Sequence, residues 1–110
     1  MNLSQFVDSL KDDGLFMANV ACWRDLPAQP AAYADFPSSI DERLRSVLCK
    51  RGVTRLYSHQ REAVDAAEMG EDFVVVTPTA SGKTLCYNLP VVSRILKDPD
   101  ARALYLFPTK

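Results

Sequence analysis

The sequence predicts an α/β fold in which helices flank the start of a parallel sheet. Two apolar runs, Phe73–Val76 and Ala103–Phe107, are typical of buried strands, and a Gly-Lys-Thr loop and a helical segment lie between them. Strand, helix and parallel strand in this order form a right-handed crossover in nearly all proteins. We therefore expect residues 38–110 to be the N-terminal part of one α/β domain, preceded by a helical and extended segment over residues 1–37.

The composition is that of an ordinary globular chain. The 110 residues carry 13 Lys and Arg against 14 Asp and Glu, and 47% are hydrophobic. This near-zero charge gives no electrostatic argument for nucleic acid. No apolar run approaches the roughly 20 residues of a membrane-spanning helix, and the three cysteines form no Cys-x-x-Cys pair. We predict a cytoplasmic protein with reduced thiols and no membrane partner, and its oligomeric state stays open.

The first 37 residues predict one helix and a proline-rich segment. Apolar residues recur at the spacing of one helical face over residues 3–11, and Gly14 follows as a stop signal. Prolines then favour extended or turn structure over residues 20–37. The aromatic side chains of that segment fit either packing against the domain or stacking on nucleobases: Trp23, Tyr33 and Phe36.

Three helices are predicted in the domain. The first begins at Ser38 or Ser39, whose hydroxyls suit an N-cap, and ends at Gly52. The next begins at Ser58 and runs to about Gly70. The last covers residues 83–97, and its Pro90 lacks an N–H group and is expected to kink it near residues 86–89.

The loop before that last helix is typical of a phosphate-binding loop. Its residues are Thr77, Pro78, Thr79, Ala80, Ser81, Gly82, Lys83 and Thr84. In such loops the backbone N–H groups and the helix N-terminus surround phosphate. Gly82 allows close approach, Lys83 is the catalytic candidate that reaches the β- and γ-phosphates, and Thr84 places its hydroxyl on Mg²⁺. We predict that this loop binds a nucleotide with Mg²⁺.

Two further segments are candidates for contacts with ligands. Gln60 offers a donor and an acceptor that match the N6 and N7 edge of adenine, with Tyr57 near the base, but its spacing alone favours a solvent-facing place in a helical first turn. His59 fits a surface or packing role. Residues 108–110 follow the second predicted strand and suit either a phosphate-backbone contact or an ordinary loop.

Together these segments resemble the opening of a superfamily 2 helicase. Thr77–Thr84 resembles motif I of DEAD/DEAH-box proteins, where the first glycine of the loop is also replaced. Leu56–Gln60 resembles the adenine-sensing Q motif, and Leu106–Lys110 resembles the start of motif Ia. The combination is most similar to the RecQ-related DNA-repair helicases typified by mitomycin repair factor A, over residues 38–110.

The resemblance implies an ATP-dependent 3′–5′ DNA helicase that uses ATP and Mg²⁺ to translocate on single-stranded DNA or duplex junctions. It assigns Tyr57 and Gln60 to adenine, and Pro108, Thr109 and Lys110 to DNA. The chain contains no Asp-Glu-x-His or Asp-Glu-Ala-Asp box. We therefore expect a RecA-like lobe truncated after its second strand and inactive alone. The alternatives are a non-helicase translocase subunit and a nucleotide-binding module without catalysis.

Overall fold

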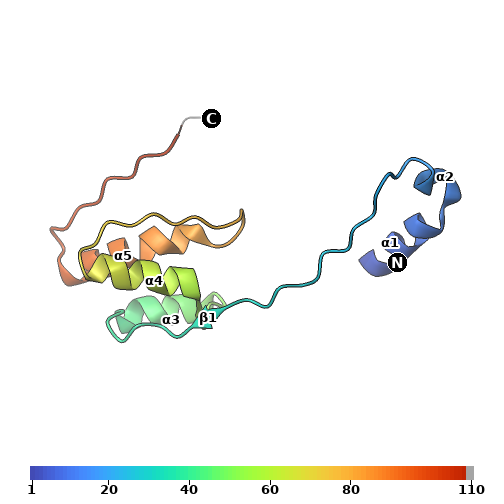
Figure 1. Ribbon diagram of the computed structural model, residues 1–110. Coiled ribbons are helices and arrows are strands. Elements are labelled where there is room, and N and C mark those ends of the chain that lie inside the picture. Colours follow the sequence, from blue (N-terminus) through green and yellow to red (C-terminus); the bar gives the residue numbers. More distant parts are fainter. Residues whose placement is uncertain (109–110) are drawn as a thin grey trace. The chain divides into compact units, whose positions relative to one another are not determined.

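Residues 1–108 are described by a computed structural model, in which the chain divides after Pro30 into two units (Figure 1). The second unit already includes Tyr33 and Ala34, which form a strand, whereas the domain boundary predicted at residue 37 stays a prediction. Among the described residues, no helix has both the length and the apolar character that a membrane crossing requires.

The first unit holds two helices, α1 (Leu3–Asp12) and α2 (Gly14–Met17). Asn2 caps α1 by accepting from the Gln5 N–H, and the Gln5 side chain accepts from the Asn2 N–H in return. Asp13 caps α2. The predicted first helix is confirmed, and the α2 turn is an addition to it, because the Asp13 carboxylate starts a new helix directly after α1 ends.

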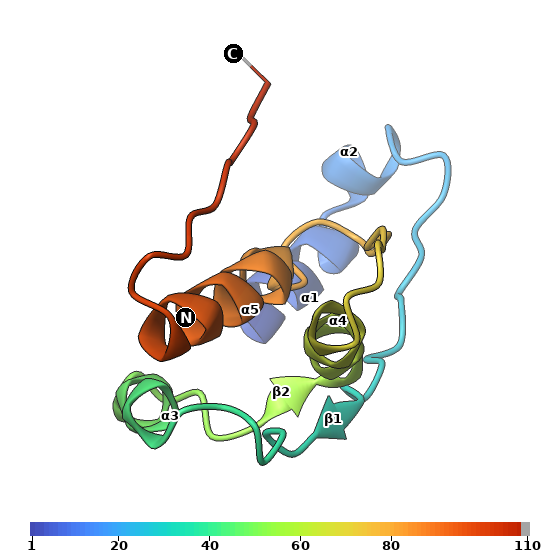
Figure 2. The same ribbon diagram turned by 90° about the vertical axis from the view of Figure 1, so that its left-hand side faces the viewer.

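The second unit combines helices with a small sheet, so it is an α/β fragment. Its elements are β1 (Tyr33–Ala34), α3 (Glu42–Lys50), β2 (Leu56–Tyr57), α4 (Ser58–Glu68) and α5 (Lys83–Lys97). The three predicted helices are confirmed. The two strands pair antiparallel, with Tyr33 opposite Tyr57, and Figure 2 shows α4 continuing directly from β2.

Asp41, and not Ser38 or Ser39, caps α3. Its carboxylate accepts the Arg43 N–H at 2.9 Å and also binds the Arg43 guanidinium at 2.7 and 2.9 Å. These hydrogen bonds lower the pKa of the Asp41 carboxyl to about 2. The predicted serine caps are wrong because α3 begins at Glu42, so the residue at the N-cap position is Asp41 and both serines precede it.

A small apolar core joins α3, α4 and α5. Leu48, Leu56, Val64 and Leu89 are buried together, and Phe36 is among the side chains that pack against them. Complete burial of each such side chain contributes roughly 1.5–3 kcal/mol. α4 packs closely against α5, and Figure 2 shows the two helices as neighbours. The core therefore fixes the positions of these two helices relative to each other.

The predicted strands Phe73–Val76 and Ala103–Phe107 are not buried strands in this structure. Within residues 1–108 neither run has a ladder partner. Each instead exposes alternate apolar side chains almost fully: Val74 at 87%, Val76 at 88%, Leu104 at 85% and Leu106 at 83%. The prediction of burial is wrong here because a strand is covered only when neighbouring strands pair with its edges and helices lie on its faces.

The final predicted helix is observed with its bounds unchanged. α5 runs from Lys83 to Lys97 and continues through Pro90. The kink expected at this proline stays a prediction.

Cys86 on α5 provides a test of the core. It is 2% exposed, and burial raises the pKa of its thiol, whereas Cys22 and Cys49 are exposed. Because the thiolate is the nucleophile, we expect iodoacetamide at neutral pH to modify Cys22 and Cys49 rapidly and Cys86 at least roughly 10-fold more slowly. Peptide mass spectrometry measures the three rates, and urea should abolish the difference. Equal rates in the folded protein would contradict this packing.

Candidate functional site

The loop from Thr77 to Gly82 makes a tight turn into the N-terminus of α5. Ala80 and Gly82 both adopt left-handed backbone conformations, with φ of 60° and 74°. Such a conformation costs a residue with a side chain roughly 1–2 kcal/mol, so the loop stores strain at Ala80. Gly82 is the N-cap of α5. The turn therefore brings the loop backbone directly onto the positive end of a helix.

The loop presents a run of free backbone donors. Within residues 1–108, the N–H groups of Gly82, Lys83 and Thr84 donate to no protein acceptor. They belong to the N-cap and the first turn of α5, where no intrahelical partner exists. Consecutive free donors at a helix N-terminus are the usual elements of a phosphate site.

Lys83 places a positive charge beside these donors. Its Nζ donates to the carbonyl oxygens of Thr77 and Pro78 at 2.8 Å each, and it lies 3.3 Å from Thr77 Oγ1 and 3.4 Å from Ser81 Oγ. The Thr77 and Ser81 hydroxyls also bond each other. The ammonium is held inside the loop by neutral oxygens, so its charge stays available to an anion.

Thr84 lies on the first turn of α5 and is exposed. Its hydroxyl oxygen is a hard ligand of the kind that Mg²⁺ accepts. The magnesium role assigned to Thr84 from the sequence stays a prediction.

Gln60 is buried, so the solvent-facing alternative is wrong. Only 2% of Gln60 is exposed. Its Oε1 accepts from the Tyr57 N–H at 2.9 Å, and its Nε2 donates to the Gly82 carbonyl at 2.9 Å. An amide has two donor hydrogens and two acceptor lone pairs. One donor and one acceptor therefore remain, which is the pair that the N6 and N7 edge of adenine requires.

A pocket of about 480 Å³ adjoins Gln60 and the start of α5. Its wall includes Tyr33, Arg55, Tyr57, Gln60, Gly82 and Leu85. The Tyr33 and Tyr57 rings are stacked 5.3 Å apart, and the Arg55 guanidinium lies 5.6 Å from the Tyr33 ring centre. Aromatic and cationic planes next to a hydrogen-bonding amide suit a flat heterocycle.

His59 belongs to the site, which sequence reasoning missed. Its Nε2 lies 2.8 Å from the Ser81 carbonyl oxygen, and its ring stacks on Tyr57 at 5.6 Å. The signal that could have found it is its place beside Gln60, in a first turn that faces the loop.

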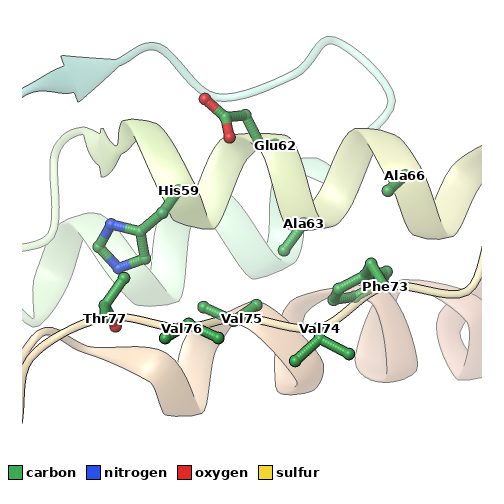
Figure 3. A pocket seen from close by; sticks show the side chains of 9 residues that line it. All are labelled: His59, Glu62, Ala63, Ala66, Phe73, Val74, Val75, Val76 and Thr77. Atoms are coloured by element: carbon green, nitrogen blue, oxygen red, sulfur yellow. The ribbon is translucent and has the colours of Figure 1, made fainter.

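A second pocket of about 350 Å³ lies between α4 and residues 73–77. Figure 3 shows Ala63 and Ala66 of α4 opposite Phe73 and Val75, with His59 near Thr77 at one end. Alanine and valine side chains line it together with His59, Glu62 and Thr77, and the Glu62 carboxylate would repel a phosphate. We therefore place the candidate site at the loop.

The predicted nucleic-acid contacts lie at the limit of the structure. Pro108 is exposed, and Thr109 and Lys110 lie outside the described residues. This contact stays a prediction.

Gly82 provides a test of the contact between α4 and the loop. A Cβ on Gly82 would lie 2.6 Å from Gln60 Nε2, whereas a Cβ on Gly70, which also has φ of 74°, would meet nothing within 4 Å. We expect Gly70→Ala to lower the free energy of unfolding by about 1–2 kcal/mol. Gly82→Ala should cost roughly 1 kcal/mol more, because the Gln60 hydrogen bond is also lost.

Urea unfolding followed by circular dichroism measures both variants. Equal losses in Gly82→Ala and Gly70→Ala would show that the Gln60 contact contributes nothing.

Known proteins similar to this chain share one activity in their names. Residues 57–110 match the DEAD/DEAH box helicase family model. The chain is 48% identical over 109 residues to the ATP-dependent helicase YprA of Bacillus subtilis, covering 99% of this chain and 14% of that protein. It is 28% identical over 108 residues to the ATP-dependent helicase HRQ1 of Saccharomyces cerevisiae, covering 98% of this chain and 10% of that one.

A solved structure gives the same result. The crystal structure of the DUF1998 helicase MrfA bound to DNA and AMPPNP matches with a TM-score of 0.86 at 47% identity, covering 99% of this chain and 15% of that chain. The chain thus spans about one seventh of the length of MrfA and YprA.

Proposed function

Since residues 57–110 of this chain belong to the DEAD/DEAH box helicase family, we propose that the loop Thr77–Thr84 binds the phosphates of ATP within an ATP-dependent DNA helicase. The run of free N–H groups around the Lys83 ammonium carries this proposal. Backbone donors at the start of α5 and the Lys83 cation form a set that fits the β- and γ-phosphates.

Gln60 and Tyr57 form the proposed adenine site. The pocket beside them adjoins Gly82, so a base there and phosphates at the loop can belong to one nucleotide. Gln60 keeps one donor and one acceptor unused. These two groups distinguish adenine from guanine, whose corresponding edge presents two acceptors.

Mg²⁺ is the proposed second cofactor, held by the Thr84 hydroxyl together with phosphate oxygens and water. When bound, the metal ion neutralises phosphate charge. Lys83 would contribute a positive charge to the phosphates, after releasing the carbonyl oxygens of Thr77 and Pro78 that it contacts.

The two exposed apolar runs support a RecA-like arrangement. Residues 73–76 and 103–107 keep strand-like alternation without strand partners. We propose that they pair with further strands in a parallel sheet, which would cover the valines and leucines now exposed.

DNA is the proposed polymer substrate. The solved structure of MrfA is described as bound to DNA. We propose that the whole protein likewise binds DNA and moves along it in the 3′–5′ direction. We also propose that it acts in DNA repair and is cytoplasmic. The proposed contacts with the phosphate backbone of DNA are made by Pro108, Thr109 and Lys110.

Hydrolysis requires groups that these 110 residues do not contain. Neither an Asp-Glu-x-His nor an Asp-Glu-Ala-Asp box occurs in the sequence. Phosphoryl transfer needs such a carboxylate and an arginine finger, and the arginine alone is worth roughly 10³–10⁵ in rate. We therefore propose that this chain alone binds ATP without turning it over.

Lys83→Ala tests the nucleotide site. Removing a charge-assisted hydrogen-bond donor should weaken Mg²⁺–AMPPNP binding roughly 10- to 100-fold. Isothermal titration calorimetry measures the affinity. Lys97→Ala, at the opposite end of α5, is the matched control and should bind like the unchanged chain. If Lys83→Ala also binds like the unchanged chain, the proposed function is wrong. DNA-stimulated ATP hydrolysis by the isolated chain that Lys83→Ala abolishes would instead contradict the proposal that this chain does not turn ATP over.

Gln60→Glu tests the adenine contact. The substitution keeps an acceptor for the Tyr57 N–H and removes the Nε2 donor, so the preference for ATP over GTP should fall by roughly 10-fold. Competition binding against a fluorescent ATP analogue gives the ratio. Gln5→Glu, at the equivalent capping position of α1, is the control. An unchanged ratio in Gln60→Glu would place the base elsewhere.

A further inference from the structure

Two successive side chains of α4 hold two successive carbonyl groups of the loop. His59 Nε2 lies 2.8 Å from the Ser81 oxygen, and Gln60 Nε2 lies 2.9 Å from the Gly82 oxygen. A carbonyl oxygen can only accept, so His59 donates as Gln60 does. The first turn of α4 therefore grips the loop backbone at adjacent peptide groups.

These contacts decide the direction of the loop's N–H groups. No peptide bond among the described residues is cis, and in a trans peptide the C=O and N–H bonds point in opposite directions. Because the Ser81 carbonyl points toward α4, the N–H of Gly82 points away from it. The Gly82 carbonyl also points toward α4, so the N–H of Lys83, which belongs to the same peptide group, points away from α4. Both belong to the run of free donors.

We propose that His59 is a positioning residue for phosphate binding, which holds the Ser81–Gly82 peptide so that the Gly82 N–H faces the ligand. The proposal rests on the nucleotide-binding function above. Glycine accepts both signs of φ at little cost, so the peptide before Gly82 has little resistance of its own to rotation. A rotated peptide would turn the Ser81 carbonyl oxygen toward a phosphate and repel it.

The surroundings of His59 hold its ring in place. The ring is nearly parallel to Tyr57, at 9° and 5.6 Å, and Tyr57 is stacked in turn on Tyr33. His59 is half-buried. The bond to Ser81 requires the hydrogen on Nε2, so neutral His59 is the Nε2–H tautomer.

Two substitutions separate the hydrogen bond from the packing. His59→Phe keeps a ring against Tyr57 and removes the donor, whereas His59→Gln removes the ring and keeps an N–H donor of similar reach. We expect His59→Phe to weaken Mg²⁺–AMPPNP binding by roughly 5- to 10-fold. We expect His59→Gln to stay within roughly twofold of the unchanged chain, because the donor is retained.

Nuclear magnetic resonance provides a readout that packing alone would not change. On addition of Mg²⁺–AMPPNP, the Gly82 amide signal should shift strongly in the unchanged chain and in His59→Gln, and much less in His59→Phe. Equal binding by His59→Phe and the unchanged chain would overturn the proposal. Equal losses in both variants would also overturn it, because the donor would then not be what matters.

A measurement on the unchanged chain covers the case in which a variant fails to fold. His59 is the single histidine of the sequence, so the ¹⁵N signals of its ring are assigned without ambiguity. The proposal requires the neutral ring to carry its hydrogen on Nε2, and an unprotonated Nε2 would overturn it. If instead Lys83→Ala binds nucleotide normally, the nucleotide-binding function itself fails, which is a distinct result.

Discussion

The hydrogen bond from the Gln60 amide to the Gly82 carbonyl is the contact on which the site depends. It joins the first turn of α4 to the last loop residue before α5, and it forms only because Gly82 has no side chain in that direction. The core around Val64 and Leu89 holds the two helices side by side. The core thus sets the distance between the two helices. The hydrogen bond from the Gln60 amide then fixes the backbone of the loop at Gly82.

A loop shaped in advance lowers the cost of binding. Ala80 carries backbone strain, which the oxygen contacts of Lys83 and the bonds from α4 offset. The bonds from α4 hold the loop through groups of the chain itself, which lowers the ordering cost of binding phosphate. Hydrogen bonds within the chain therefore shape the proposed binding site, and they turn the N–H groups of Gly82 and Lys83 away from α4.

Local rules predicted the parts of this structure that depend on neighbours in sequence. The α5 bounds follow from the sequence pattern, whereas phosphate binding by the Gly-Lys-Thr loop stays a prediction. The burial of Gln60 and the role of His59 did not follow, because both depend on a loop 22 residues away. The runs at 73–76 and 103–107 were predicted as buried because their composition is apolar. Composition cannot supply the hydrogen-bonded neighbours that burial requires.

The proposed nucleotide site and the proposed parallel sheet depend on different parts of a protein. Among residues 1–108, the hydrogen bonds that shape the loop come from α4, α5 and the loop itself, including its first residue, Thr77. The outer faces of residues 73–76 and 103–107, in contrast, have no cover among residues 1–108. The contacts proposed for phosphate are thus local to two packed helices and the loop between them, whereas phosphoryl transfer requires further charges. Binding and turnover should therefore be physically separable in this protein.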